Sequence, residues 1–151
     1  MKDEYFMKQA LAQAKKAYSE DEVPIGAVMV KDGAIIARGR NKRHRGGDAT
    51  DHAEMICIRR ACKKLKDWRL DGCELYVTLE PCPMCAGAAL NARLKRVVYG
   101  AADEKGGALD SNFGILCSGV LNWKCEKKGG VLKEECESIL KNFFAEKRSN
   151  K

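Results

Sequence analysis

Apolar residues recur along this chain with two different periods, which separate its helices from its strands. Three stretches place apolar residues three or four positions apart, the spacing of one helical face. These predicted helices cover residues 7–18, 52–66 and 131–147. Four short runs rich in β-branched and aromatic residues predict strands at residues 25–30, 34–37, 75–79 and 96–99.

The order of these elements predicts a single domain over residues 1–151. Asp32-Gly33, between two apolar runs, marks a hairpin. A further helix, rich in small residues, follows the strand at 75–79, and we expect it to be buried against a neighbour. Alternating strands and helices predict an α/β fold in three layers, with one central sheet between helices.

Two segments give weaker patterns. Residues 38–48 are basic and contain glycine, which predicts a loop that is either solvated or RNA-facing, with His44 as an exposed loop residue. Residues 108–130 predict a short helix or turn, followed by a strand near residues 122–126.

Composition narrows the class of protein. The hydrophobic share of 45% and the charged share of 32% are typical of a soluble globular domain. No apolar run approaches the roughly 18 residues of a membrane span. The acidic start leads into an amphipathic stretch, so we expect no signal peptide and a cytoplasmic protein. A formal net charge of +7 favours an anionic partner such as nucleic acid.

Two of the eight cysteines stand in a metal-binding spacing. Cys82 and Cys85 belong to Pro-Cys-Pro-Met-Cys, in which Pro83 fits the first position of a helix and brings both thiols to one face. A lone Cys-x-x-Cys also has redox and structural-zinc interpretations. The other cysteines are expected to be mostly small buried hydrophobic residues: Cys57, Cys62, Cys73, Cys117, Cys125 and Cys136.

His52-Ala53-Glu54 completes the candidate chemistry. Catalytic zinc sites use three protein ligands and keep a fourth position for water, and His52, Cys82 and Cys85 supply three. Glu54 is then a proton carrier rather than a ligand. The alternative is a helix cap, because Asp51-x-x-Glu54 resembles a capping box. Combined with Pro-Cys-x-x-Cys, however, His-x-Glu is the signature of zinc deaminases.

With these residues in place, the chain resembles the cytidine-deaminase superfamily and, within it, the bacterial tRNA-specific adenosine deaminases. The similarity runs nearly end to end. It is carried by Asn41 and by residues 22–27, 76–82, 84–87, 97–100 and 143–144. The chain departs from the family pattern at Ala49, Asp51 and Trp123. These departures leave the chemistry intact and bear on which RNA is used.

The resemblance implies a cytidine-deaminase-like fold with a mixed five-stranded sheet, and a homodimer with one Zn²⁺ per chain. It implies hydrolysis of adenosine to inosine at the wobble position of a tRNA anticodon stem-loop. Zinc-activated hydroxide would attack C6 while Glu54 shuttles protons. His52, Cys82 and Cys85 match the zinc ligands. The family's substrate-binding positions match Asn41, Val23, Pro24, Phe143, Phe144 and Arg148.

Two other functions fit part of the same pattern. A deaminase of a free base or nucleoside, of the guanine or cytosine type, would use the same zinc chemistry, but a small neutral base needs no basic docking face. A zinc-stapled RNA-binding module without catalysis would require a fourth protein ligand. Cys57 or Cys73 are candidates for that ligand, although neither has motif spacing.

Overall fold

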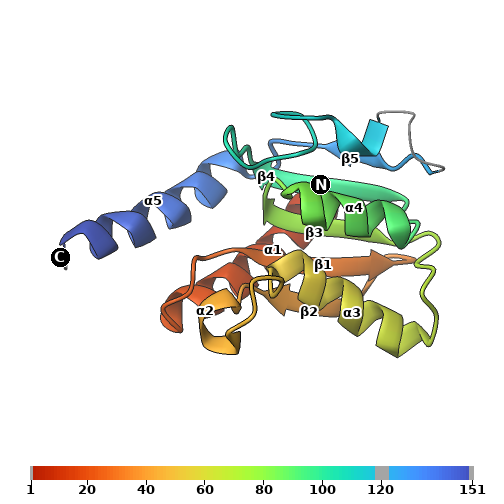
Figure 1. The fold of residues 1–151 in the computed structure, drawn as a ribbon, viewed down its shortest axis with the longest axis horizontal. Coiled ribbons are helices and arrows are strands. Elements are labelled where there is room, and N and C mark those ends of the chain that lie inside the picture. Colours follow the sequence, from red (N-terminus) through yellow and green to blue (C-terminus); the bar gives the residue numbers. More distant parts are fainter. Residues whose placement is uncertain (1, 118–122, 150–151) are drawn as a thin grey trace.

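The computed structural model describes residues 2–117 and 123–149, with five strands, five α-helices and one 3-10 helix. The strands are β1 (Gly26–Lys31), β2 (Ala34–Arg40), β3 (Glu74–Leu79), β4 (Arg96–Ala101) and β5 (Glu126–Lys128). The helices are α1 (Lys2–Ser19), α2 (Arg43–Gly46), α3 (Ala53–Leu65), α4 (Pro83–Asn91), η1 (Ile115–Cys117) and α5 (Lys133–Ser149) (Figure 1).

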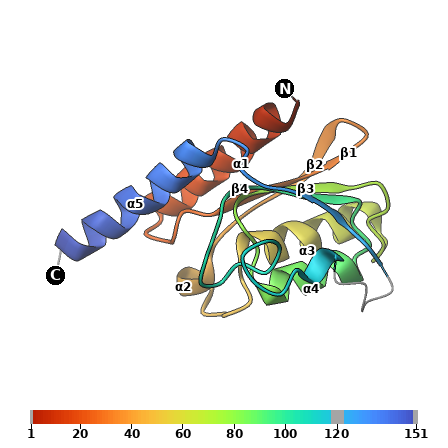
Figure 2. The same cartoon turned by 90° about the horizontal axis from the view of Figure 1, so that it is seen from above.

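The strands form one mixed sheet in the order β2-β1-β3-β4-β5. Strand β1 is antiparallel to both β2 and β3, whereas β3, β4 and β5 run parallel. Helices α1 and α5 cover one face, and α3 and α4 cover the other (Figure 2). The predicted three-layer α/β fold with a mixed five-stranded sheet is therefore confirmed.

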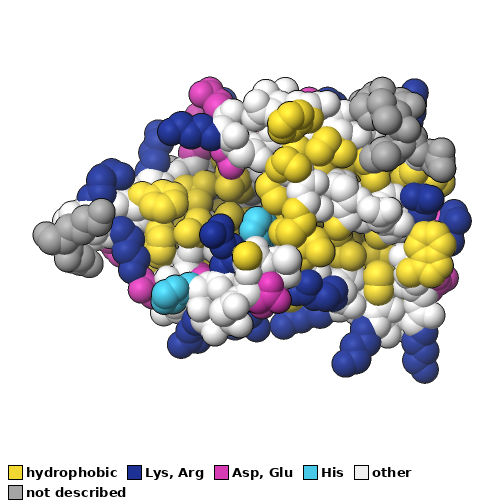
Figure 3. All heavy atoms as spheres, viewed as in Figure 1, with side chains coloured by type: hydrophobic (Ala, Val, Ile, Leu, Met, Phe, Trp, Pro, Cys, Tyr) yellow, Lys and Arg dark blue, Asp and Glu magenta, His cyan; other side chains and the backbone are white. Residues whose placement is uncertain are grey.

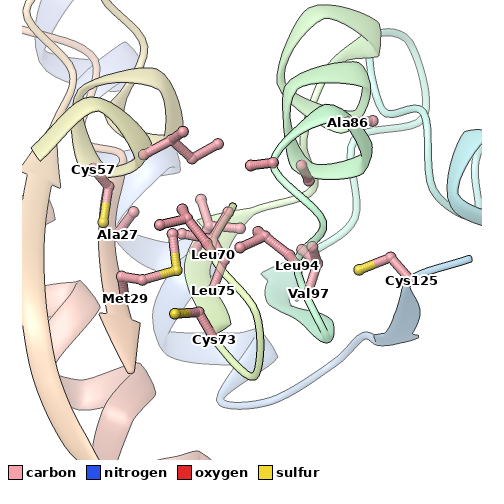
Figure 4. Packing of buried hydrophobic residues seen from close by; sticks show 14 of the residues in the cluster. Ala27, Met29, Cys57, Leu70, Cys73, Leu75, Ala86, Leu94, Val97 and Cys125 are labelled. Atoms are coloured by element: carbon pink, nitrogen blue, oxygen red, sulfur yellow. The ribbon is translucent and has the colours of Figure 1, made fainter. Parts of the chain in front are cut away.

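Strand β1 is buried on both faces of the sheet, as its continuous apolar run predicts. Because side chains alternate along a strand, Ala27 and Met29 pack toward α3 and α4 (Figure 4), while Val28 and Val30 pack toward α1. Gly39 on β2 lets α3 approach closely, since a Cβ there would lie 2.4 Å from the carbonyl oxygen of Ala53. This contact fixes the start of α3 against the sheet.

The basic segment at residues 38–48 is not simply a loop. Strand β2 continues to Arg40, which pairs with Gly26 in the ladder, and its guanidinium binds Glu20 with a Nε–Oε1 distance of 2.7 Å. Residues 43–46 then form the short helix α2. The buried Glu22 carboxylate accepts hydrogen bonds from the main-chain N–H groups of His44 and Arg45, which orders this turn.

Other boundaries moved by a few residues. The predicted strand near residues 122–126 lies at Glu126–Lys128, and residue 122 is outside the described part of the chain. The short helix expected within 108–130 is η1. Cys57, Cys73, Cys125 and Cys136 are buried as predicted and Cys62 is half-buried, while the side chain of Cys117 is outside the described residues.

Candidate active site

Two helices begin at the predicted metal ligands. His52 is the N-cap of α3, and Cys82 is the N-cap of α4, with Pro83 at its first helical position. Neither helix has a side-chain hydrogen bond at its N-cap. The positive ends of both helix dipoles therefore face the same point, which favours thiolate over thiol.

The structure brings His52, Cys82 and Cys85 together. Their ligand atoms all lie within 4.8 Å of one another. His52 Nδ1 is 3.6 Å from Cys82 Sγ and 3.5 Å from Cys85 Sγ. Zinc bonds of about 2.3 Å to sulfur and about 2.0–2.1 Å to nitrogen, at a tetrahedral angle, require a separation of roughly 3.6 Å. The two nitrogen–sulfur separations thus match those of a tetrahedral zinc site.

Hydrogen bonds within this group shift the pKa values of the two thiols in opposite directions. The bond from Cys85 to Cys82 lowers the pKa of the Cys82 thiol to about 4, and His52 adds to the effect. The same bond, together with burial, raises the pKa of Cys85. The bond with Cys82 also raises the pKa of His52. These bonds favour the thiolate form of Cys82, which is the form that binds a metal ion.

Glu54 lies in the first turn of α3 with only 4% of its surface exposed. The capping-box interpretation of this residue is wrong, because the N-cap is His52 and not Asp51. Asp51 instead pairs with Arg59, with 2.6 Å between Oδ1 and Nη2, so its charge is balanced away from the ligands. Burial raises the pKa of Glu54 to about 7, where a carboxylate both accepts and releases protons at neutral pH.

A pocket of about 260 Å³ opens beside these residues. It is smaller than the roughly 300–1,000 Å³ of sites for drug-sized ligands, which suits a single base. The residues that line it are Val23, Ile25, Asn41, Arg43, His52, Ala53, Glu54, Leu79, Glu80, Cys82 and Asp103. A larger hollow of about 1090 Å³ lies between α1 and α5 and includes none of the three ligands.

Two further hollows adjoin the pocket and share Val23 with it. One, of about 500 Å³, is lined by residues that include Arg43, Phe143 and Lys147. The other, of about 420 Å³, is lined by residues that include Lys105 and Phe144. Val23 therefore borders three depressions, one of which is lined by the candidate ligands His52 and Cys82.

Asn41 lines the pocket and is 5% exposed. Its Nδ2 donates to the carbonyl oxygen of Val23 at 3.2 Å, and its Oδ1 accepts the N–H of Arg43 at 3.2 Å. The amide therefore closes the turn after β2. Since an amide has two N–H groups and an oxygen with two lone pairs, one donor and one acceptor site remain for a ligand.

The other predicted substrate-binding residues are dispersed. Pro24 is buried and lines none of the three hollows that meet at Val23. Phe143 is 5% exposed and packs edge-on against Tyr18, whereas Phe144 is 43% exposed. Arg148 is exposed near the end of α5 and is not among the lining residues of the same three hollows.

Three charged residues that line the pocket were not among the predicted site residues. Arg43 belonged to the basic segment, where its charge was the available signal. Glu80 follows the predicted strand at residues 75–79 and was included in the resemblance without a role, and no pattern marked Asp103. Burial opposes ionisation of Glu80, but hydrogen bonds from Ser111 and from main-chain N–H groups lower its pKa to about 2. Glu80 is therefore a buried anion at neutral pH.

Known proteins resemble this chain along almost its whole length. The family model of MafB19-like deaminases matches residues 1–148. A tRNA-specific adenosine deaminase of Bacillus subtilis (strain 168) is 50% identical over 149 residues, which cover 99% of this chain and 92% of that protein.

Solved structures resemble it as well. One, from a study of A-to-I editing by tRNA:A34 deaminases at the wobble position of transfer RNA, superposes with a TM-score of 0.87 at 46% identity and covers 90% of this chain and 99% of that one. A guanine deaminase from Bacillus subtilis has a TM-score of 0.63 at 48% identity and covers 66% of this chain and 64% of that one. By the match over residues 1–148, the chain belongs to the MafB19-like deaminase family.

Proposed function

We propose that this protein deaminates adenosine to inosine at the wobble position of a tRNA anticodon loop. The observation that carries the proposal is the buried Glu54 carboxylate beside three convergent ligand atoms, in a pocket of the size of one base. The relatives named tRNA-specific adenosine deaminase supply the substrate. The reaction consumes one water and releases one ammonia.

We propose one zinc ion per chain, held by His52, Cys82 and Cys85. Two thiolates and one imidazole are a donor set that suits zinc. Within the described residues, the candidate metal group contains these three side chains and no fourth, so one coordination position is left for water. When bound, zinc lowers the pKa of that water toward about 7 and makes it a nucleophile at neutral pH.

This donor set weakens the alternative of a non-catalytic zinc-stapled module. Neither Cys57 nor Cys73 joins the group. The Cys57 thiol donates to the carbonyl oxygen of Ala37 at 3.6 Å, and the Cys73 thiol to that of Asp71 at 3.8 Å. Both act as buried side chains with local partners, on the side of the sheet where α3 and α4 pack.

Glu54 moves the protons in the proposed reaction. Its carboxylate takes a proton from the attacking water and delivers it to the ring nitrogen next to C6. It then takes the proton of the hydroxyl group now on C6 and passes it to the amino group, which leaves as ammonia while the C6 carbonyl forms. A pKa near 7 matches both the acceptance and the release of a proton at neutral pH. Burial behind the pocket keeps bulk water from competing for these protons.

The surface around the pocket supports an RNA substrate. Arg43, Lys105 and Lys147 line the pocket or its neighbouring hollows, and the chain has a net charge of +7. The target base must leave any stack to reach Glu54, and an anticodon loop supplies bases that are already unpaired. We propose that Val23 and Asn41 contact the inserted nucleoside, with Pro24 supporting Val23 from behind, and that Phe143, Phe144 and Arg148 meet the loop outside the pocket.

We propose a homodimer that buries the outer face of α4. Met84, Gly87 and Ala88 are only half-buried there, and a Cβ built on Gly87 meets no atom within 4 Å. Hydrophobic side chains gather on the face that α3 and α4 present, between groups of Lys and Arg (Figure 3). Small residues allow a second backbone to approach such a helix closely.

The described helices include none that is long and apolar enough to cross a membrane.

A free-base deaminase is the second candidate, because a guanine deaminase is 48% identical over 66% of this chain. Incubating the zinc-loaded protein with an adenosine-containing anticodon stem-loop, with free guanine, adenine and cytosine, and with their nucleosides separates the two. We expect inosine to form in the stem-loop at least about 100-fold faster than any free base reacts, since binding energy outside the pocket orients the target. Preferential turnover of guanine would overturn the proposal.

We propose the cytoplasm as the compartment, because thiolate ligands need reducing conditions.

A further inference from the structure

Glu80 holds an irregular segment with five hydrogen bonds. Its Oε1 accepts from the N–H of Asp103 at 3.1 Å and from the Ser111 hydroxyl at 2.6 Å. Its Oε2 accepts from the N–H groups of Leu109, Asp110 and Ser111 at 3.1, 2.9 and 2.9 Å. The carboxylate is 2% exposed, and its donors are main-chain amides and one hydroxyl rather than a lysine or arginine. These bonds satisfy a buried charge without forming an ion pair.

The segment that Glu80 holds has no regular structure of its own. Residues 102–114 lie between the end of β4 and η1 and contain only turns and bends. Main-chain N–H groups in such a segment need partners when they are buried. A Cβ at Gly107 would lie 2.3 Å from Cδ of Glu80, so the segment wraps around the carboxylate more closely than any other residue type would permit.

The same segment forms one wall of the pocket. Asp103 lines the pocket beside Glu54 and Cys82, and Lys105 lines the adjoining hollow. Glu80 is two residues before Cys82, and the N–H of Ala108 donates to the carbonyl oxygen of Pro81 at 2.8 Å. One short stretch, 80–82, therefore carries a metal ligand and the anchor of the opposite wall.

We propose that Glu80 is a positioning residue that sets the wall formed by residues 103–111 relative to the metal ligands, and so sets the affinity for the nucleoside. Glu80 acts through Asp103 and Lys105, since its own oxygens are taken by the segment. The inference rests on the proposed function for its kinetic readout. A purely structural role would lower stability and leave substrate affinity unchanged.

Glu80→Gln tests the inference with little change of shape. An amide keeps one acceptor oxygen, which is best placed on the three N–H groups of residues 109–111. Its NH₂ group then faces the N–H of Asp103, so that bond is lost and the pocket side of the segment is released. Ser111→Ala is the milder variant, since it removes only the hydroxyl bond. Asp3→Asn is the control, because Asp3 is a half-buried carboxylate whose partners Tyr76, Arg96 and Lys128 are absent from the pocket lining.

We would measure zinc content and hydrogen exchange of the 103–111 amides on the wild type and the three variants. Their kcat and KM are measured with the substrate that the wild type turns over. For Glu80→Gln we expect about one zinc per chain and a kcat within about threefold of the wild-type value. We expect KM to rise about tenfold, the effect of losing one charged hydrogen bond. Exchange at 103–111 should accelerate. Ser111→Ala should raise KM about threefold, and Asp3→Asn should leave KM unchanged.

Two results would overturn the positioning role. One is an unchanged KM in Glu80→Gln, and the other is an equal rise of KM in the control Asp3→Asn. If Glu80→Gln does not fold, an unchanged KM and exchange in Ser111→Ala reject the inference, and the expected changes support it. Failure of the wild type on the stem-loop with turnover of a free base would reject the proposed substrate, while the KM comparison still decides the role of Glu80.

Discussion

His52 Nδ1 lies 3.5 Å from Cys85 Sγ, although 33 residues separate the two in the chain. The segment between β2 and α3 returns to the sheet through two main-chain bonds. The N–H of Asn41 donates to Ile25, and the N–H of Lys42 donates to Asp51. Strand β3 runs directly into the turn that starts α4. The site thus depends on long-range topology, and a bound cation would join the starts of two helices that lie far apart in the chain.

Glu54→Gln should retain about one zinc per chain and lose turnover by about 10²–10⁴-fold, the usual contribution of a general acid–base residue. The amide keeps the shape of the side chain but cannot carry the proton. Metal analysis and single-turnover rates on the same preparation measure both quantities. His52→Ala is the matched control and should lose the metal. Loss of zinc in Glu54→Gln would identify Glu54 as a ligand instead.

Most of the helices and strands, and the cluster of His52, Cys82 and Cys85, were predictable because each leaves a pattern in the sequence. The spacing within the two motifs identified His52, Cys82 and Cys85, and the period of the apolar residues predicted β1 and α1. The role of Glu80 was not predictable, since four of its five donors are main-chain N–H groups, which leave no side-chain signature, and all five lie 23 to 31 positions away. Asn41 could be placed in the site by resemblance, but its turn-closing bonds depend on where Val23 lies. Asp51 matched a capping pattern, but its carboxylate pairs instead with Arg59, eight residues later in the chain, and so does not cap the helix.

Binding of the anticodon stem-loop should weaken steeply with salt, because contacts between basic side chains and phosphates release counterions. With about four such contacts, affinity should fall roughly 50-fold between about 50 and 200 mM salt. Arg43→Gln should lower the slope of log Kd against log salt by about one. Lys31→Gln, at the far end of β1, should leave it unchanged. A flat salt dependence for the wild type would favour the free-base alternative.

Asp3→Asn should destabilise the protein by about 2 kcal/mol at pH 7, since it weakens hydrogen bonds to charged partners. Burial of Asp3 opposes ionisation, but hydrogen bonds from Arg96, Lys128 and Tyr76 outweigh it and hold its pKa well below the usual range. A lowered folded pKa contributes stability above the unfolded value of about 3.9 that is lost as pH falls below it.

Urea unfolding of both proteins from pH 7 to pH 3 measures this difference. The gap between wild type and Asp3→Asn should be constant down to about pH 5 and should narrow below about pH 4. Zinc loss in acid affects both proteins equally and cancels in the comparison. A gap that keeps its full size at pH 3 would contradict the assignment of this network.

Gly87→Arg should convert the proposed dimer to monomers without unfolding the chain. Open space around Gly87 accommodates a side chain within one subunit, so the thermal midpoint of the monomer should change little. A second backbone against α4 would meet the new charged side chain. Sedimentation of the wild type and the variant gives the mass of each, with Lys141→Ala, at an exposed position of α5, as the control. A wild type that sediments as a monomer at micromolar concentration would exclude the dimer.

Asn41→Ala separates recognition from chemistry. The side chain joins Val23 to Arg43 by two hydrogen bonds and keeps one donor and one acceptor site for the nucleoside. Removing it should leave zinc content unchanged and lower kcat/KM on the stem-loop by about 1–3 kcal/mol, or about 5- to 150-fold, because a buried partner loses its hydrogen bond. Part of that loss can come from the turn itself, since Val23 and Arg43 both line the pocket. Asn41→Asp separates the bond with Arg43 from the N–H groups of the side chain. Its carboxylate still accepts the N–H of Arg43 but offers no N–H to the nucleoside or to the carbonyl oxygen of Val23. An Asp variant as impaired as the Ala variant assigns the loss to these N–H groups, whereas wild-type kcat/KM in the Asp variant would confine Asn41 to the turn.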